Sequence, residues 1–402
     1  MEKWIECKIS DIGTVVGGAT PSTKKPENYE NGDIAWITPK DLSSFSGRYI
    51  QRGERNITEI GLKSCSTQLL PKNTVLFSSR APIGYVAIAE NAVCTNQGFK
   101  SVIPNEDTDP IFLYYLLKYN KDKIESMGSG TTFKEVSGNT MKNIVVSVPQ
   151  DKQVQEKIAS VLDAIDEKIE ENERINNNLL EQAIALYEHL LQEAEWPTAT
   201  ILDVAKKVAM GPFGSNIKIS TFVPEGVPII SGNHLRGYFL EEPEFNYITE
   251  EHAERLKNSI VFSHDLIFTH AGNIGQVAMI PDGCKYDRYV LSQRQFYLRC
   301  DETKVVPEFL LLFFHSASGQ HELLSYANQT GVPSIAQPAS NLKKIPFKYP
   351  PMHEQLMWQK QVHPLLSQYL NNRLENERLS SLRDTLLPKL MSGELDVSDI
   401  EL

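Results

Sequence analysis

The stretch 165–190, IDEKIEENERINNNLLEQAIALYEHL, and the stretch 365–390, LLSQYLNNRLENERLSSLRDTLLPKL, carry one pattern at an offset of 200 residues. Their shared positions recur alternately four and three residues apart, which is the spacing by which one helix packs along another. The first copy of this helix-pair seam consists of Ile165, Ile169, Asn172, Asn176, Leu179, Ala183, Leu186 and Leu190. The second copy consists of Leu365, Tyr369, Asn372, Asn376, Leu379, Arg383, Leu386 and Leu390. We therefore expect two long helices that pair with each other.

Two neighbouring asparagines occupy the same seam positions in both copies. A buried asparagine destabilises a coiled coil but is tolerated where it fixes the register. If the two helices pair antiparallel, Asn172 and Asn176 should lie near Asn372 and Asn376 at the middle of the seam. The alternative is a pair of unrelated amphipathic helices with polar gaps.

The regions that precede these helices also repeat. The run IAWIT at 34–38 parallels VPIIS at 227–231, and MKNI at 141–144 parallels LKKI at 342–345. The longer run LFSSRAPIGYVA at 76–87 parallels IFTHAGNIGQVA at 267–278. The chain thus reads as a tandem duplication. The expected domains are residues 1–150, a central helix at 151–195, residues 196–350, and a distal helix with its tail at 351–402.

Each globular half is expected to mix strands and helices. Short β-rich runs are bounded by Gly, Pro, Asn and Ser, and helices are predicted at 110–118 and 307–315, where apolar residues recur after a proline. The predicted fold class is α+β, with two tandem mixed domains separated by two long antiparallel coiled-coil helices in a pseudo-twofold arrangement. Pro364 is expected to start or kink the distal helix, and Pro388 and Gly393 are expected to end it.

Composition indicates an ordinary globular protein of more than one domain. The chain has 402 residues, 41% hydrophobic and 23% charged. Its net charge of −11 is concentrated in residues 151–195, which hold 4 basic and 12 acidic side chains. The five cysteines form no CxxC pair, and neither an apolar run of membrane-spanning length nor a signal-peptide pattern occurs. We expect a cytoplasmic protein.

Motifs for cofactors and catalysis are missing from the sequence. There is no GxxxxGK[ST] or GxGxxG loop, no Asn/Asp-Pro-Pro-Tyr/Phe run of amino-methyltransferases, and no HxxxH or HExxH metal motif. Asp166-x-Lys168 formally fits half of a nuclease metal motif, but a solvated helix face is the preferred interpretation. We therefore expect no catalytic residue, no metal and no cofactor in this chain.

Glycine-rich turns carry the residues suited to nucleic acid. Such turns lie at 17–22, 128–134 and 211–216, where backbone N–H groups, hydroxyls and lysines suit phosphate contact. Arginine, amide and imidazole side chains nearby suit contact with base edges. The candidate DNA-binding residues are Gly18, Thr20, Ser22, Lys24, Lys40, Arg80, Gln97, Lys134, Ser215, Asn216, Lys218, Asn233, His234, Arg236, His270, Asn273, Gln293 and Arg294. Each could instead serve only the structure of its turn.

These residues lead to a family resemblance over essentially the whole chain. The closing run LRDTLLPKLMSGEL at 382–395, with PPMHEQ at 350–355 and the looser copy PQDKQ at 149–153, resembles the specificity subunits of Type I restriction–modification enzymes. GATPS at 18–22 and RAPIG at 80–84 are similar to runs in the first recognition domain of such subunits. The second domain departs from this pattern, with Ala271 and Gly272 near the places of Arg80 and Pro82.

The resemblance implies a function and a set of partners. It implies that each of two target recognition domains reads one half of a split double-stranded DNA site, while two helices hold the domains apart. It also implies two methyltransferase subunits that carry S-adenosylmethionine chemistry, and motor–nuclease subunits that carry ATP-driven cleavage. Three alternatives remain: a fused enzyme with a degenerate motif, a coiled-coil adaptor that binds protein, and a specificity subunit of another defence system.

Overall fold

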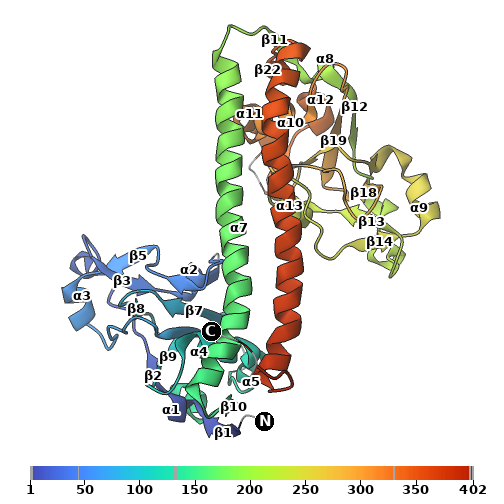
Figure 1. Cartoon of the computed structure of the whole chain (residues 1–402). Helices are drawn as coiled ribbons and strands as arrows, with labels where there is room; N and C mark the ends of the chain where they lie inside the picture. Colours follow the sequence, from blue (N-terminus) through green and yellow to red (C-terminus); the bar gives the residue numbers. More distant parts are fainter. Residues whose placement is uncertain (1–2, 44, 131–133, 329–330, 398–399, 401–402) are drawn as a thin grey trace. The chain divides into compact units, whose positions relative to one another are not determined.

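The computed structural model describes residues 3–43, 45–130, 134–328, 331–397 and 400. The chain divides into two compact units (Figure 1). Unit 1 comprises Met1–Ile175 and Asn371–Leu402, and unit 2 comprises Asn176–Leu370. Each unit therefore contains one globular domain together with one part of each long helix.

The two long helices are α7, Lys152–Gln192, and α13, Met352–Met391. Pro364 lies inside α13, so of the two expected effects, a start or a kink of the helix, the start was wrong and the kink stays a prediction. Val362 and Leu366 on either side of it are buried, and their packing compensates for the missing backbone donor. Pro388 also lies within the last turn, whereas Gly393 takes a positive φ of 75° just beyond the helix end.

The domain of unit 1 is built on three sheets. A five-stranded sheet has the order β2-β9-β6-β7-β4, a three-stranded sheet has the order β5-β3-β8, and β1 pairs antiparallel with β10. The strands are β1 Trp4–Lys8, β2 Gly13–Gly17, β3 Ile34–Ile37, β4 Tyr49–Ile50, β5 Arg55–Ile57, β6 Val75–Ser79, β7 Ile83–Ala89, β8 Cys94–Thr95, β9 Lys100–Pro104 and β10 Val145–Pro149. The short helices are α1 Ile9–Ile12, η1 Pro26–Asn28, α2 Pro39–Ser43, α3 Glu59–Lys63, α4 Pro110–Tyr119, α5 Lys121–Ser126 and α6 Gly138–Asn143.

The domain of unit 2 repeats this plan. Four-stranded sheets have the orders β12-β19-β16-β17 and β14-β13-β18-β15, β11 pairs antiparallel with β22, and β20 with β21. The strands are β11 Thr198–Thr200, β12 Ala205–Met210, β13 Val227–Ile230, β14 Asn246–Ile248, β15 Ile260–Val261, β16 Leu266–Thr269, β17 Val277–Met279, β18 Tyr289–Leu291, β19 Gln295–Cys300, β20 Ala327–Asn328, β21 Ser334–Ile335 and β22 Pro346–Lys348. The helices are α8 Ile201–Val204, η2 Gly214–Asn216, η3 Ile219–Thr221, η4 Gly232–His234, α9 Glu250–Arg255, η5 Lys257–Ser259, α10 Pro307–His315, α11 Ala317–Leu324 and α12 Pro338–Leu342.

The duplication predicted from sequence is confirmed element by element. The repeated runs at 34–38 and 227–231 contain β3 and β13, each of which pairs in parallel with one strand and antiparallel with another. The runs at 76–87 and 267–278 form the antiparallel pairs β6·β7 and β16·β17. The helices predicted at 110–118 and 307–315 are α4 and α10. The α+β fold class is confirmed with them.

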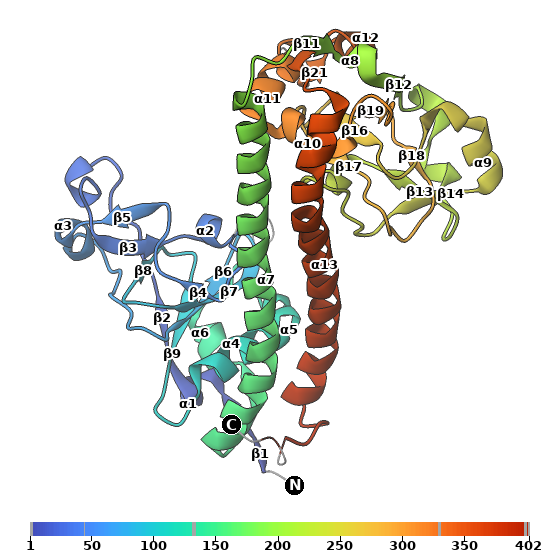
Figure 2. The same ribbon diagram turned by 45° about the horizontal axis from the view of Figure 1, so that its top comes forward.

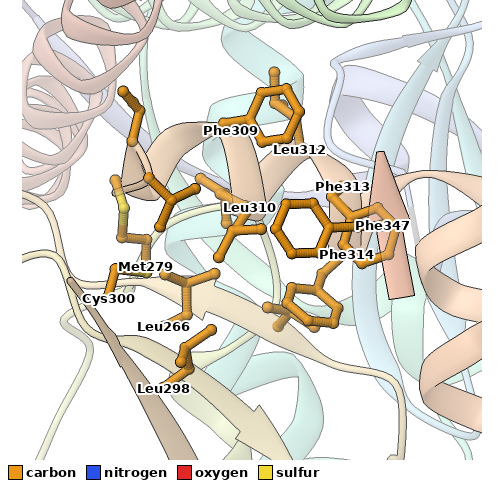
Figure 3. Packing of buried hydrophobic residues seen from close by; sticks show 14 of the residues in the cluster. Leu266, Met279, Leu298, Cys300, Phe309, Leu310, Leu312, Phe313, Phe314 and Phe347 are labelled. Atoms are coloured by element: carbon orange, nitrogen blue, oxygen red, sulfur yellow. The ribbon is translucent and has the colours of Figure 1, made fainter. Parts of the chain in front are cut away.

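The core of each domain includes both long helices. In unit 1, residues of α4 pack with Ile158 and Leu162 of α7 and with Leu390 and Met391 of α13, as the grouping of these elements in Figure 2 shows. In unit 2, the α10 residues seen in Figure 3 pack in one cluster with the end of α7 and the start of α13. The long helices are thus core elements of both domains as well as partners of each other.

A buried glutamine fastens the first turn of each long helix to its domain. Gln155 Oε1 accepts from the Asp109 N–H at 3.0 Å, and its Nε2 donates to the Pro149 carbonyl at 3.1 Å. Gln355, 200 residues later, accepts from the Val306 N–H at 3.1 Å and donates to the Pro350 carbonyl at 2.8 Å. The two units therefore share polar contacts as well as topology. In the described parts of the chain, no helix is apolar enough over a sufficient length to cross a membrane.

Candidate nucleic-acid interface

The ends of β2, β3, β6 and β8 meet at one edge of the domain in unit 1. Backbone hydrogen bonds join the loops that follow them: the Ala19 N–H donates to the Thr95 carbonyl at 3.0 Å, and the Ser79 N–H donates to the Gly98 carbonyl at 2.7 Å. We call residues 17–24, 38–40, 79–82 and 95–98 the first loop cluster. It holds Gly18, Thr20, Ser22, Lys24, Lys40, Arg80 and Gln97 of the predicted DNA-binding residues.

Glycine is required where these loops touch. A Cβ on Gly18 would lie 2.1 Å from the Thr95 carbonyl oxygen, which no real contact allows. Beyond this contact the chain turns outward, where the Thr20 hydroxyl is hydrogen-bonded to Gln97 Oε1 and both side chains are exposed. The structure therefore brings Thr20 and Gln97 together at the surface from strand ends far apart in sequence.

Arg80 is held beside a carboxylate at the end of β6. Its Nη1 lies 3.8 Å from Glu135 Oε2, and Lys100 Nζ lies 3.4 Å from Glu135 Oε1. The side chain of Arg80 remains 36% exposed, so this ion pair orients the guanidinium without burying it. An exposed, oriented guanidinium is suited to bidentate contact with guanine or phosphate.

The other candidates of unit 1 lie on the surface with looser surroundings. Ser22 and Lys24 are exposed, and Lys40 pairs with Glu54 at 2.7 Å on a fully solvated face. Lys134 is also exposed, while residues 131–133 of its glycine-rich turn lie outside the described part.

The same strand ends meet in unit 2, at β12, β13, β16 and β18. The Gly211 N–H donates to the Gln295 carbonyl at 2.8 Å, and the His270 N–H donates to the Arg294 carbonyl at 2.9 Å. A Cβ on Gly211 would lie 2.0 Å from the Ser292 carbonyl oxygen, so Gly211 repeats the close approach of Gly18. We call residues 210–214, 231–234, 269–276 and 292–295 the second loop cluster.

Three amide side chains and one guanidinium lie at the surface of the second loop cluster. Asn233, Asn273, Gln293 and Arg294 are exposed, and His270 Nε2 lies 3.0 Å from the Gln293 carbonyl oxygen. The His270 ring thereby braces the loop that presents Gln293 and Arg294.

A polar network beneath this surface was missed from the sequence. Gln276 donates to the Gly232 carbonyl at 3.2 Å and accepts from the Thr269 hydroxyl at 3.1 Å. Gln295 is 1% exposed, and its Nε2 lies 3.4 Å from Thr269 Oγ1. These side chains join three loops of the cluster, and a polar residue at the end of a buried strand, such as Thr269 after Leu-Ile-Phe in β16, was the available signal.

His234 differs from the other candidates because its ring is buried. It is 4% exposed, stacks on Phe245 at a centroid distance of 4.4 Å, and accepts from the Ser231 N–H at 2.9 Å. Burial lowers the pKa of its imidazole, which favours the neutral ring. This is the environment of a structural side chain, and DNA contact by His234 stays a prediction.

The remaining candidates of unit 2 lie outside the second loop cluster. Arg236 is exposed beyond η4, and Asn216 and Lys218 are exposed at η2 and η3. The Asn216 carbonyl oxygen lies 2.7 Å from His252 Nε2, which ties this segment to α9. Ser215 lies in η2. DNA contacts of these residues stay predictions.

The seam of the two long helices contains the predicted asparagine contact. In unit 1, Asn172 is 1% exposed and its Nδ2 donates to Asn376 Oδ1 at 2.8 Å and to Glu375 Oε2 at 2.7 Å. Asn376 Nδ2 lies 3.3 Å from the Ile169 carbonyl oxygen. As residue numbers rise along α7, those of the contacting residues on α13 fall, which confirms antiparallel pairing in this unit.

The other seam residues line the same faces at graded depths. Ile165, Ala183, Leu190 and Leu390 are buried, as are Asn176 and Asn372. Half-buried positions are Ile169, Leu179, Leu186, Leu365, Tyr369, Leu379 and Leu386.

The prediction of a solvated face for Asp166 was wrong. Asp166 is 5% exposed, accepts from the Tyr115 hydroxyl at 2.7 Å and from Arg383 Nη1 at 2.7 Å. A second buried cation, Arg48 of the domain, donates to both carboxylate oxygens of Glu170 at 3.0 Å. The domain of unit 1 is thus held to α7 by ion pairs as well as by apolar packing. Helix periodicity alone does not reveal such ion pairs.

No metal site arises from the described residues, since they bring no three His, Cys, Asp or Glu side chains together in a suitable cluster.

The comparisons with known proteins agree in their assignment. The model of the family described as Type I restriction modification DNA specificity domain matches twice, at residues 1–181 and 193–383. The chain is 32% identical to the Type I restriction enzyme MjaIX specificity subunit of Methanocaldococcus jannaschii, over 99% of this chain and 94% of that protein. It is 30% identical to the EcoR124I/EcoR124II specificity subunit of Escherichia coli over 39% of this chain and 40% of that one.

A solved structure shares the fold. The S subunit of a Type I restriction–modification system from M. genitalium superposes with a TM-score of 0.60 at 15% identity, covering 97% of this chain and 96% of that one. Two family matches in tandem and a relative aligned over nearly the full length leave one assignment: the chain belongs to the specificity subunits of Type I restriction–modification enzymes, the DNA-recognition components of a defence system.

Proposed function

We propose that each domain reads one half of a bipartite double-stranded DNA site, domain 1 at residues 1–150 and domain 2 at residues 196–350. The observation that carries this proposal is the duplicated loop cluster. In both units the same four strand ends meet around a glycine that admits no side chain, and both present exposed side chains of the types suited to base edges. A protein with two equivalent readers is suited to two half-sites separated by DNA that it does not read.

Different side chains in the two clusters suit different half-sites. The first cluster offers the Arg80 guanidinium and the Gln97 amide, which suit guanine and adenine respectively. The second offers Asn273, Gln293 and Arg294, with no counterpart of the Arg80–Glu135 pair at Ala271. Exposed loop N–H groups, hydroxyls and lysines would contact phosphates and position each domain without reading sequence.

We assign the long helices two roles, at 151–195 and 351–402. Their seam holds buried polar contacts that penalise other registers, so a fixed pairing could set the gap between half-sites. Their outer faces, acidic on α7, would dock the methyltransferase subunits, for which two equivalent positions follow from the duplication.

The chain itself is proposed to be non-catalytic. Methylation and ATP-driven cleavage would belong to methyltransferase and motor–nuclease subunits, which is the division of labour that the family implies. Because its proposed substrate is chromosomal and invading DNA, we place the complex in the cytoplasm.

Selection from a random duplex library tests the bipartite reading. The chain, with its methyltransferase subunits where these are needed for solubility, should enrich two short motifs at a fixed gap, and its affinity should fall steeply with salt. Arg80→Ala should relax the first motif alone and Arg294→Ala the second alone. Lys63→Ala is the matched control, because it removes the same charge from an exposed side chain of α3 that belongs to neither loop cluster and to neither long helix.

A single continuous motif, or affinity that does not respond to salt, would contradict the proposal. Relaxation of both motifs by either variant would contradict the assignment of one half-site to each domain.

A further inference from the structure

The buried ion pair in the seam of unit 1 has no equivalent in unit 2. Asp166 and Arg383 are joined at 2.7 Å, with 7% and 20% of their side chains exposed, and Tyr115 of α4 completes the site. The positions 200 residues away are Leu366 and Ala183. At this layer, one copy of the helix pair is charged and the other is apolar.

The equivalent site of unit 2 is apolar throughout. Leu312, which lies five residues after the first proline of α10 as Tyr115 does in α4, takes the place of the tyrosine (Figure 3). Leu312, Leu366 and Ala183 are all buried in one cluster, at 2%, 3% and 0% exposure. A polar trio in one unit thus corresponds to an apolar trio in the other.

This difference matters because two helices with the same seam pattern can also pair with a second copy of the chain. If α7 paired with α7 of another chain in the same antiparallel register, Asp166 would face Ala183 of that chain. If α13 paired with α13, Leu366 would face Arg383. Exchange of α7 would leave the buried Asp166 carboxylate with the Tyr115 hydroxyl but without a cation, and exchange of α13 would leave Arg383 with only the exposed Asp384 of its own helix. Each loss would occur twice by symmetry, and removing the cation from a buried carboxylate is strongly destabilising.

The asparagine layers cannot make this distinction. Asn172 faces Asn376 within the chain, and in an exchanged α7 pair it would face Asn176, another asparagine. The asparagines therefore select the register but leave the partner undefined. Lys168 and Glu375, 3.6 Å apart, would also lose each other on exchange, but both are about half exposed and contribute little.

We propose that the Asp166–Arg383 ion pair selects the helix partner, so that α7 pairs with α13 of its own chain and not with a second copy of the chain. The ion pair acts by destabilising exchanged dimers as much as by stabilising the pairing within the chain. This role is independent of DNA binding and of the proposed function.

Moving the ion pair tests the proposal at constant composition. The variant Ala183→Arg/Arg383→Ala places both charges on α7. An exchanged α7 pair then brings Asp166 of one chain against the new arginine of the other, and an exchanged α13 pair is apolar at this layer. Pairing within the chain instead places each of the two charges opposite an apolar residue. We expect this chain to form an exchanged dimer whose dissociation constant is at least about a hundredfold lower than that of the native chain.

A second variant provides the matched control. Adding Asp166→Leu and Leu366→Asp to the same two changes restores a charged pair within the chain, now in unit 2, and should restore the monomer. The native chain, the double variant and the quadruple variant have identical composition and net charge. Light scattering after size exclusion, with energy transfer between differently labelled chains refolded together, reports exchange.

A folded, monomeric double variant would overturn the proposal, as would a quadruple variant that dimerises like the double one. Should the double variant fail to fold, Tyr115→Leu/Asp166→Leu/Arg383→Ala decides, because it copies the apolar trio of unit 2. Refolded at high concentration, it should exchange chains where the native protein does not. Equal exchange in the two proteins would also overturn the proposal.

Discussion

Removing one asparagine of the layer in unit 1 should destabilise the protein, and removing its partner as well should restore it. Asn172 is 1% exposed and donates to Asn376 at 2.8 Å and to Glu375 at 2.7 Å. Asn172→Leu leaves the Asn376 carbonyl facing leucine, whereas Glu375, 47% exposed at its side chain, can turn to water. An unpaired buried polar group costs about 1–3 kcal/mol, and the partial exposure of Asn376 favours the lower half of that range.

The double variant Asn172→Leu/Asn376→Leu replaces both partners by apolar groups, which is close to neutral or stabilising. A double-mutant cycle should therefore return a coupling energy of about 1–2 kcal/mol between the two positions. Urea unfolding, followed by far-UV circular dichroism, gives the free energy of unfolding for each member of the cycle. The neighbouring Asn371 is exposed, so Asn371→Leu should change this free energy by less than about 0.5 kcal/mol.

Additive single effects, with coupling below about 0.5 kcal/mol, would refute the reasoning. The same reasoning extends to the leucine variant of all four layer asparagines, which should be more stable yet sample other registers. Spin labels on the two helices of unit 1 should then show a broader distance distribution than in the native chain.

Three further outcomes follow from contacts described above. Gly18→Ala should destabilise unit 1 by about 1–3 kcal/mol, because its Cβ would meet a carbonyl oxygen at 2.1 Å. Gly17→Ala, whose Cβ would meet nothing nearer than 3.9 Å, is the control and should be nearly neutral in the same urea titration. Gln155→Leu should lower the free energy of unfolding by about 2–5 kcal/mol, because it leaves buried backbone groups without hydrogen-bond partners. It should also speed amide hydrogen exchange at the start of α4, and Gln355→Leu should do the same at the start of α10. Slower or unchanged exchange would count against this role. Arg294→Ala should leave the salt dependence of DNA affinity unchanged, because this side chain is proposed to read a base; a slope lowered by about one unit would instead indicate a phosphate contact and contradict that role.

The architecture could be predicted because helical periodicity and duplication both reflect which residues are buried. Leu190 and Leu390, or Asn172 and Asn372, recur at seam spacing because one face of each helix is buried, and burial restricts residue type. The distal helix was expected from residue 351, and α13 begins at Met352. The alternative start at Pro364 was wrong, because proline weakens a helix only locally while Val362 and Leu366 beside it are held by packing in the core.

The buried charges could not be predicted in the same way. Asp166 and Arg383 are 217 positions apart, and each alone is typical of a solvated helix face. Only the folded chain brings them together with Tyr115. The loop clusters follow the same rule: Thr20 and Gln97 were each identified as candidates, but their contact depends on how four strand ends converge.

Methylome sequencing of a domain exchange tests the central claim most directly. Residues 1–150 would be replaced by the first domain of another specificity subunit, and the chimaera expressed with the native methyltransferase subunits. If each domain reads its own half-site, one half of the methylated motif should change while the other half and the gap stay as in the native chain. A change in both halves, or a changed gap with the native helices in place, would contradict the account.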